Sequence, residues 1–287
     1  MKVFVTGADG LLGSTLVPYL RDCGHDVATY LRYKADGSVS DLSDEYETDQ
    51  SLEKAVPEVI INLASLTNVD ECEKSPYRAY LSNVRIIENL VSWVKNKNPS
   101  CHLIQISTDH VYDGFGPHLE NDVTFTNFYA FSKYAGELVA SRVQSTVLRT
   151  NFFGPSACKT RKSLSDWLFD SLHKKASITV FDDVKFNPLS ISTLVKMIEL
   201  SMRNQHTGVF NLGSKGNMSK ADFALEFASA MGLSAEYVKR DIIETARLYA
   251  RRPRNMHMDS SKFELTFGIK LPSLKQEIDS MRDAYEK

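Results

Sequence analysis

Three glycines near the amino terminus constrain the fold of this chain more than any other feature. Gly7, Gly10 and Gly13 are spaced Gly-x-x-Gly-x-x-Gly. They follow the strand-like run Lys2–Thr6 and open the helical pattern Leu11–Cys23. In such a turn the first glycine permits a tight bend, the second lets backbone approach a pyrophosphate, and the third lets helix pack closely on strand. The amino end of the helix then offers free N–H groups to phosphates. The sequence therefore predicts a dinucleotide-binding unit.

The first half of the chain alternates short β-branched runs with longer helical patterns, which is typical of a parallel sheet covered by helices. The expected strands are Lys2–Thr6, Asp26–Leu31, Val59–Asn62, His102–Ser107 and Thr146–Arg149. The expected helices, with apolar residues every three or four positions, are Leu11–Cys23, Pro76–Lys97 and Asn127–Val143. The predicted fold class is α/β, with a Rossmann-type doubly wound parallel sheet.

The pattern becomes less regular after about residue 150, and it predicts a smaller, mostly helical substrate-binding lobe. Helices are expected at Ser163–Lys174, Ile191–Arg203, Lys220–Met231 and Leu274–Tyr285, and short strands at Ile178–Phe181 and Gly208–Leu212. We expect residues 1–150 to form the dinucleotide-binding domain, rejoined by about 188–213. Residues 151–187 and 214–287 then form the lobe.

Composition excludes several classes of partner. The chain has 287 residues, a formal net charge of −2 and 24% charged residues, which gives no reason to expect nucleic acid or an anionic membrane surface. No window approaches the roughly 18 apolar residues of a membrane span, and the amino terminus does not resemble a signal peptide. The four cysteines have no paired spacing, so we expect neither disulfides nor a metal site. A cytoplasmic location is the expectation.

A tyrosine and a lysine four residues apart form the second strong signal. Tyr129 and Lys133 lie within a predicted helix, where positions four apart share a face. A nearby ammonium lowers the pKa of a phenol, which can then donate a proton to a carbonyl oxygen. About 20 residues earlier, a predicted strand ends in the hydroxyl residues Ser107 and Thr108, where α/β sheets bind ligands. The order and spacing of the three signals predict a nicotinamide-dependent oxidoreductase.

The end of the second predicted strand bears on the choice of cofactor. An acidic residue there would hold the ribose 2′-hydroxyl of NAD, but the chain has Arg32 and Lys34 instead. Two cations are suited to a 2′-phosphate. The sequence therefore favours NADPH, and NADH remains possible.

Longer stretches carry a family resemblance. Residues Pro57–Glu73, Ser107–Gly114, Tyr129–Glu137 and Ala250–Asn255 resemble the corresponding segments of dTDP-4-dehydrorhamnose reductases, within the extended short-chain dehydrogenase/reductases. The resemblance runs from residue 1 to about 285. It implies reduction of the 4-keto group of a nucleotide-linked 6-deoxyhexose.

The resemblance, with the motifs above, also implies site residues. Those implied in catalysis are Thr108, Tyr129 and Lys133. Those expected along the cofactor are Gly7, Asp9, Gly10, Leu11, Leu12, Gly13, Arg32, Asp41, Leu42, Asn62, Ala64, Ser65, Asn83, Tyr129 and Lys133. Those expected at the nucleotide sugar are Thr67, Val69, Asp109, His110, Phe152, Arg251 and Arg252. For the last two, a solvated loop is an equally good interpretation.

The chain departs from the family pattern at several places. His110 replaces a usual Tyr, Phe152 replaces a Trp near the sugar, and Phe186–Leu189 replaces a Gly-x-Pro-Thr stretch. Thr15 stands where some members have an acid that binds metal at a dimer interface. The exact sugar and a metal-bridged dimer therefore stay open, and a homodimer is a possibility. We expect His110 to be a hydrogen-bonding residue and not a metal ligand, because no other His or Cys shares its spacing.

Two alternative functions remain at this point. Arg149–Pro155 also resembles a loop of nucleotide-sugar epimerases and dehydratases, but a dehydratase has an acidic pair after the catalytic hydroxyl, and here Asp109 is followed by His110. The other alternative is a non-catalytic regulatory subunit that keeps the fold and binds NADP. Fold alone does not fix function, although an intact Tyr129 and Lys133 argue against this alternative.

Overall fold

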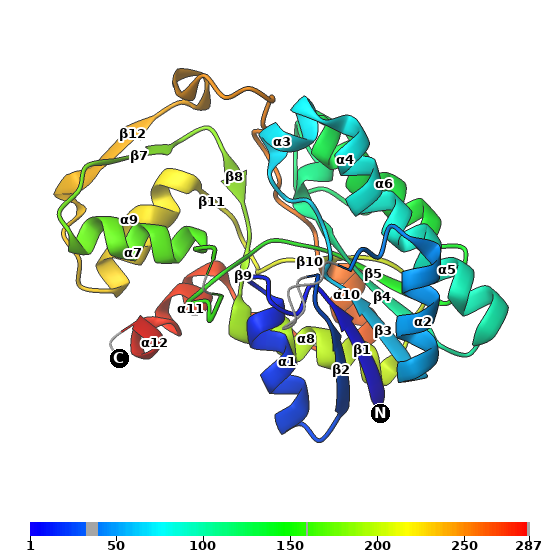
Figure 1. Cartoon of the computed structure of the whole chain (residues 1–287). Helices are drawn as coiled ribbons and strands as arrows, with labels where there is room; N and C mark the ends of the chain where they lie inside the picture. Colours follow the sequence, from blue (N-terminus) through cyan, green and yellow to red (C-terminus); the bar gives the residue numbers. More distant parts are fainter. Residues whose placement is uncertain (33–39, 159, 286–287) are drawn as a thin grey trace.

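The computed structural model describes residues 1–32, 40–158 and 160–285. Its main feature is a six-stranded sheet in which every neighbouring pair is parallel. The strands are β1 (Lys2–Thr6), β2 (Asp26–Tyr30), β3 (Val59–Asn62), β4 (His102–Thr108), β5 (Ser145–Thr150) and β10 (Gly208–Leu212). They lie in the order β10-β5-β4-β3-β1-β2 (Figure 1). The predicted α/β class is confirmed. Because the chain reverses direction across the sheet between β1 and β3, the crevice for a ligand opens at their carboxyl ends.

Helices cover both faces of this sheet. They are α1 (Gly13–Asp22), α2 (Glu45–Ala55), α3 (Val69–Lys74), α4 (Pro76–Tyr80), α5 (Ile86–Lys97), α6 (Phe128–Ala140), α8 (Ile191–Asn204) and α10 (Ser261–Phe267). Val3 and Val5 of β1 face the core shared with α1, α8 and α10. Phe4, between them, faces the core shared with α2, α5 and α6. This alternation follows from the two-residue period of a strand that is buried on both sides.

Most of the remaining elements pack around a third hydrophobic core beside the sheet. Its helices are α7 (Leu164–His173), α9 (Lys220–Ala230), α11 (Leu274–Asp279) and α12 (Arg282–Tyr285). Its short strands are β6 (Phe152–Phe153), β7 (Ile178–Phe181), β8 (Lys185–Phe186), β9 (Leu189–Ser190), β11 (Met218–Ser219) and β12 (Val238–Asp241). They pair as β6–β9, β7–β12 and β8–β11. This core supports the proposed substrate lobe, and β10 has returned to the main sheet (Figure 1).

Some predicted helices are interrupted. The pattern at 76–97 becomes α4, a π-helical turn at Leu81–Arg85 and α5. The pattern at 274–285 divides after α11, where Ser280 Oγ donates to the Glu277 carbonyl at 2.8 Å, a local bond that competes with helical pairing.

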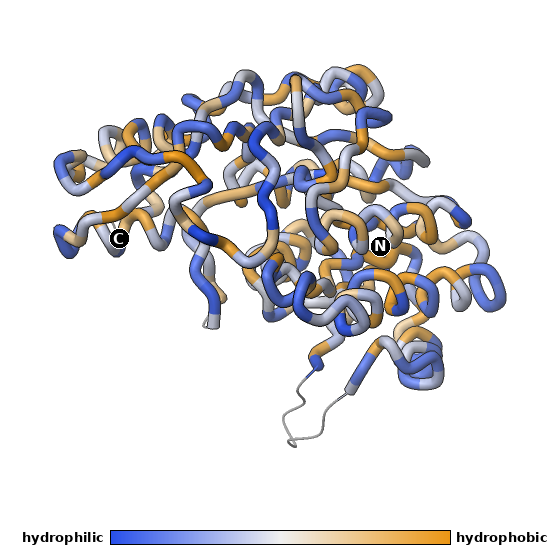
Figure 2. The backbone as a smooth tube through the Cα atoms, turned by 90° about the horizontal axis from the view of Figure 1, so that it is seen from above, coloured by the Kyte–Doolittle hydropathy of each residue, from blue (hydrophilic) through white to orange (hydrophobic). Residues whose placement is uncertain are grey.

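Hydropathy alternates along the helices, as helices with one buried side require. Figure 2 shows orange and blue following each other within single helical segments. Across residues 1–32, 40–158 and 160–285, no helix combines the length and hydrophobicity of a membrane span.

Candidate active site

The glycine loop joins β1 to α1 in the way the sequence predicts. Gly7 has φ of +65°, a left-handed conformation that favours glycine. Its carbonyl accepts the N–H of Gly10 at 3.1 Å, which closes the turn. A Cβ on Gly13 would lie 2.7 Å from Ala8 Cα, so a side chain there would push α1 off the loop. The bare backbone and the helix amino terminus form a cradle that fits a dinucleotide pyrophosphate.

A chain of buried side chains behind this loop joins the ends of β1 and β3 to the middle of β4. Thr6 Oγ1 donates to Asn62 Oδ1 at 2.6 Å, and Asn62 Nδ2 donates to Gln105 Oε1 at 2.8 Å. Thr6 Oγ1 also accepts the N–H groups of Leu63 and Ala64. Asn62 is completely buried, so the structure places it beneath the loop and away from the cavity. It orders the strand ends that a cofactor would meet.

Asn83 has a similar supporting place. Its Oδ1 accepts from Ser65 Oγ at 2.9 Å and from the Leu66 N–H at 2.8 Å. Its Nδ2 donates to the Leu66 carbonyl at 3.1 Å and to Ser132 Oγ at 2.9 Å. The side chain is buried in the π-helical turn, and every polar group on it is satisfied. Asn83 therefore fixes the segment after β3 against α6 and does not line the cavity.

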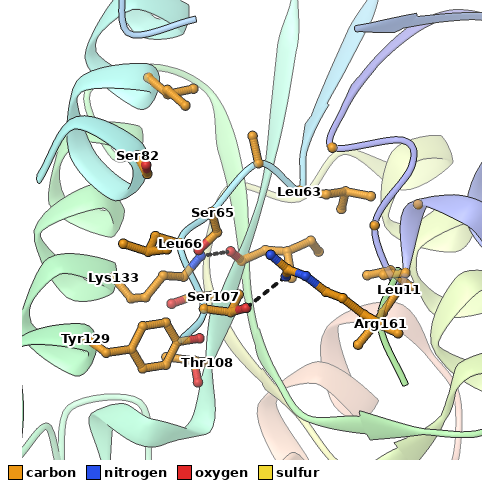
Figure 3. A pocket seen from close by; sticks show the side chains of 18 of the residues that line it. Leu11, Leu63, Ser65, Leu66, Ser82, Ser107, Thr108, Tyr129, Lys133 and Arg161 are labelled. Carbon is orange, nitrogen blue, oxygen red and sulfur yellow. Dashed lines mark hydrogen bonds between the residues drawn. The ribbon is translucent and has the colours of Figure 1, made fainter. Parts of the chain in front are cut away.

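A cavity of about 770 Å³ opens above the carboxyl ends of β1, β3 and β4 (Figure 3). The predicted site residues that line it are Gly7, Asp9, Gly10, Leu11, Leu12, Gly13, Arg32, Asp41, Leu42, Ala64, Ser65, Thr67, Val69, Thr108, Asp109, His110, Tyr129, Lys133 and Phe152. The structure thus brings the glycine loop, the hydroxyl strand end and the Tyr–Lys pair to one cavity. Lys34 lies outside the described residues.

Tyr129 and Thr108 meet at one side of the cavity. Asn127 caps α6 by accepting the N–H of Ala130 at 2.9 Å, which sets where the helix begins. Tyr129 is the second residue of this helix, and its hydroxyl lies beside the Thr108 side chain (Figure 3). Both side chains are buried. An oxygen atom brought to this point can be hydrogen-bonded by two hydroxyl groups.

The electrostatics of Tyr129 differ from the expectation. The sequence predicted that a neighbouring ammonium would lower the pKa of this phenol. Burial instead raises its pKa well above the usual value, and the nearby Asp109 carboxylate adds to the rise. The neighbouring Thr108 hydroxyl lowers the pKa and only partly offsets these effects. The phenol is therefore fully protonated at neutral pH, which suits a proton donor.

Lys133 lies one turn beyond Tyr129 on the same face of α6. Its ammonium donates to the Ile106 carbonyl at 2.7 Å, at the edge of the cavity (Figure 3). Burial lowers its pKa to about 8, while the Glu137 carboxylate acts in the opposite direction. The side chain is therefore cationic at neutral pH and close to its titration point.

An ion pair that the sequence analysis missed supports this face of α6. Glu137 and Arg149 each have side chains only 2% exposed and pair at 2.6 Å. Ser107, next to Thr108, donates to the same Glu137 carboxylate. Arg149 also donates to the Tyr112 hydroxyl at 2.6 Å. The four-residue spacing of Tyr129, Lys133 and Glu137 places all three on one face of a helix, and this spacing could have indicated Glu137 from the sequence.

Asp109 and His110 form the floor beside Thr108. Asp109 accepts from Asn151 Nδ2 at 2.7 Å, and burial raises the pKa of its carboxyl to about 6. Burial lowers the pKa of His110 to about 3, with Lys220 contributing, so the imidazole is neutral. Its Nδ1 is buried without a hydrogen-bond partner among the described residues. Among all residues that the structure describes, no three His, Cys, Asp or Glu side chains are grouped so that they could hold a metal ion.

Arg251 and Arg252 do not line the cavity. Arg252 forms an ion pair with Asp70 at 2.9 Å and is 17% exposed. The Arg251 side chain is 74% exposed, with its guanidinium 3.6 Å from Asp113. Its backbone carbonyl accepts from Asn127 Nδ2 at 2.9 Å, so this loop helps to hold the start of α6. The predicted contact of this pair with substrate stays a prediction.

The cavity also has lining residues that the sequence analysis did not name. Among them are residues of α4 and the π-helical turn, Asn151, and residues 160–164 before α7: Arg78, Leu81, Ser82, Asn151, Thr160, Arg161, Lys162, Ser163 and Leu164. Residues 160–164 follow Phe152, a predicted substrate residue. Their position after a strand end was the signal that could have indicated them.

The whole chain, residues 1–287, matches the family described as the RmlD substrate binding domain. The chain belongs to this family. A dTDP-4-dehydrorhamnose reductase from Sinorhizobium fredii is 28% identical over 292 residues, 96% of this chain and 95% of that protein. The methionine adenosyltransferase 2 subunit beta of Danio rerio is 27% identical over 289 residues, 95% of this chain and 86% of that protein.

A solved structure supports the same fold. The crystal structure of dTDP-4-dehydrorhamnose reductase from Bacillus anthracis, in complex with NADP, superposes with a TM-score of 0.88. The match covers 99% of this chain and 100% of that chain at 24% identity. At this level of identity the likeness concerns the fold, and the chemistry has to be argued from the residues of this chain.

Proposed function

We propose that this RmlD-family protein is an NADPH-dependent reductase of the 4-keto group of a nucleotide-activated 6-deoxy sugar. The observation that carries the proposal is the meeting of the Tyr129 and Thr108 hydroxyls, with Lys133 beside them, in the cavity that begins at the glycine loop. The 28% identity to a dTDP-4-dehydrorhamnose reductase over nearly the whole chain supports the substrate class.

The described residues fit a nicotinamide dinucleotide. The glycine loop would hold the pyrophosphate, and Arg32, exposed at the cavity rim beside Asp41, is placed to meet the adenosine ribose. The bound cofactor supplies a hydride to the carbonyl carbon. An arginine at this rim, with no acid at the strand end, supports preference for a 2′-phosphate and hence NADPH.

The residues of the chain have separate roles in this proposal. Thr108 orients the carbonyl oxygen of the sugar by hydrogen bonding. Tyr129, kept protonated by burial, donates its proton to that oxygen as the alcohol forms. The Lys133 ammonium, which lines the same cavity, is placed to hydrogen-bond the ribose next to the nicotinamide. Asp109 and the unpartnered Nδ1 of His110 are placed to hydrogen-bond sugar hydroxyls.

A non-catalytic role is the second candidate, because a relative of similar identity is named as a subunit of another enzyme. The two functions, and the epimerase alternative, are separated by cofactor consumption. Purified protein should be mixed with dTDP-, UDP- and GDP-4-ketosugars and NADPH, and absorbance followed at the nicotinamide band. A reductase consumes one NADPH for each sugar, whereas an epimerase recycles its cofactor. Absence of consumption across the panel, with NADPH still bound, would favour the regulatory function.

The homodimer also stays a prediction. Sedimentation velocity at several protein concentrations measures it directly.

A further inference from the structure

One arginine at the cavity has a charge that the proposed chemistry does not yet use. The cationic side chains that line the cavity are those of Arg32, Arg78, Lys133, Arg161 and Lys162. Arg78 pairs with Glu71 at 2.6 Å, and Lys162 pairs with Asp170. Lys133 donates to a carbonyl beside the Tyr129 site, and Arg32 lies at the adenosine end. Among the residues that the structure describes, Arg161 is the remaining lining cation.

Arg161 reaches across the cavity to a neutral partner. Its Nη1 donates to Thr67 Oγ1, in the segment after β3, at 3.2 Å. Figure 3 shows the side chain extending from the Leu11 side of the cavity toward Ser107. Within residues 1–32, 40–158 and 160–285, no carboxylate is within ion-pair distance of its guanidinium. A guanidinium has five donor N–H groups, so most of them are free for a ligand.

The segment that carries Arg161 is attached to the glycine loop. Ser156 Oγ donates to the Leu11 carbonyl at 3.3 Å, and Cys158 Sγ donates to the Asp9 carbonyl at 3.3 Å. These contacts place Arg161 between the glycine loop and the segment after β3. The guanidinium therefore stands above the cavity, between the cofactor cradle and the site of Tyr129 and Thr108.

The proposed function requires two anionic diphosphates in this cavity. The glycine loop and the amino end of α1 provide for one of them, the pyrophosphate of the dinucleotide. The second belongs to the nucleotide sugar, and Arg251 and Arg252, which the sequence placed at that substrate, lie outside the cavity lining. A planar guanidinium binds phosphate oxygens through paired, charge-assisted hydrogen bonds.

We propose that Arg161 binds the diphosphate of the nucleotide sugar. The inference rests on the proposed function, since it assumes a nucleotide diphosphate in the substrate. Binding exchanges the single hydrogen bond to Thr67 for a charged partner. The sugar ring is then directed toward Tyr129 and Thr108.

The test compares two ligands and four proteins by isothermal titration calorimetry. The first ligand is NADPH. The second is dTDP, added to protein that is already saturated with NADP⁺. If the unmodified chain binds UDP or GDP more tightly than dTDP, that nucleotide is used in its place. The proteins are the unmodified chain, Arg161→Gln, Arg252→Gln and Arg203→Gln. Arg203 serves as the matched control because it is an exposed arginine of α8, paired with Glu199 and outside the cavity lining.

Arg161→Gln should weaken binding of the nucleoside diphosphate about 10- to 100-fold, the range for losing charge-assisted hydrogen bonds. NADPH affinity should stay within about twofold, since the glycine loop holds that pyrophosphate. Arg161→Lys should bind more tightly than Arg161→Gln but less tightly than the unmodified chain. Lysine keeps the positive charge but lacks the paired N–H groups with which a guanidinium binds a phosphate. Arg203→Gln should change neither affinity.

Three results would overturn the inference: unchanged nucleoside diphosphate binding in Arg161→Gln, an equal loss for NADPH, or a loss confined to Arg252→Gln. Unmodified protein that binds no nucleoside diphosphate overturns it as well. Failure of the proposed function looks different. If the protein binds a nucleoside diphosphate through Arg161 but reduces no ketosugar, the proposed reductase function is wrong and the diphosphate site stands. If it reduces a ketosugar and Arg161→Gln does not affect the reduction, only the diphosphate site is wrong.

Discussion

The buried pair of Glu137 and Arg149 yields a prediction with a clear magnitude. Arg149 Nε lies 3.0 Å and 3.1 Å from the two Glu137 oxygens, and Nη2 lies close to Oε2. Both side chains are 2% exposed, so neither charge can be solvated if the other is removed. In Arg149→Met the Glu137 carboxylate keeps, among the described residues, the hydrogen bond from the Ser107 hydroxyl and a weaker, longer-range attraction to the Lys133 ammonium. Breaking such a pair costs about 3–5 kcal/mol of unfolding free energy.

This loss should be visible in thermal unfolding followed by circular dichroism. For a chain of this size, 1 kcal/mol shifts the Tm by about 2–4 °C, so Arg149→Met should lower it by about 6–20 °C. The matched control is Arg203→Met, which removes an arginine whose side chain is 55% exposed and which pairs with Glu199, four residues earlier on the same helix. That pair contributes about 0.3–0.5 kcal/mol, and the Tm should fall by no more than about 2 °C.

The double variant Glu137→Met/Arg149→Met separates the pair from simple loss of packing. Replacing both buried charges by apolar side chains of similar length is often neutral, so most of the Tm should return. Equal shifts in Arg149→Met and Arg203→Met would refute the reasoning. So would a double variant less stable than Arg149→Met, because the single change would then not have left an uncompensated charge.

Two further predictions concern the cofactor and the pH profile. Replacing Arg32 and Lys34 by Ala should erase a preference for NADPH over NADH by about 1.5–3 kcal/mol for each charge-assisted bond lost; equal dissociation constants for the two cofactors in the unmodified chain would contradict the assignment. Because burial lowers the pKa of Lys133 to about 8, its ammonium is present below that pH and is lost above it. Turnover at saturating cofactor and ketosugar should therefore fall as pH rises through about 8, whereas an undiminished rate at pH 9.5 would exclude a role for the charged lysine.

The sequence alone was sufficient to predict the structure where a local residue pattern reflects a requirement of the backbone. Gly7 needs its left-handed φ and Gly13 has no room for a Cβ, so the glycine spacing predicted both the turn and the first helix. Val3, Phe4 and Val5 are all apolar, as is typical of a strand buried on both sides, and the structure places them in the cores on the two faces of the sheet.

The sequence was insufficient where tertiary contacts decide. Helix α2 was missed because only Thr48 and Leu52 of its residues are buried, which leaves no apolar period to detect. Asn83 matched a cofactor-contacting position, but its four hydrogen bonds hold the segment after β3. The raised pKa of Tyr129 follows from burial, and burial is invisible in a four-residue spacing. Arg161 meets Thr67 from a segment 94 positions away, beyond any local motif.

The most direct test of the central claim is hydride transfer by Tyr129→Phe under saturating NADPH and the preferred ketosugar. The substitution keeps the ring packed against His110 and removes only the hydroxyl that meets Thr108. If Tyr129 is the proton donor, turnover should fall by roughly the 10²–10⁴-fold expected of a general acid, while the dissociation constant for NADPH barely changes. Turnover within a few-fold of the unmodified protein would contradict the mechanism.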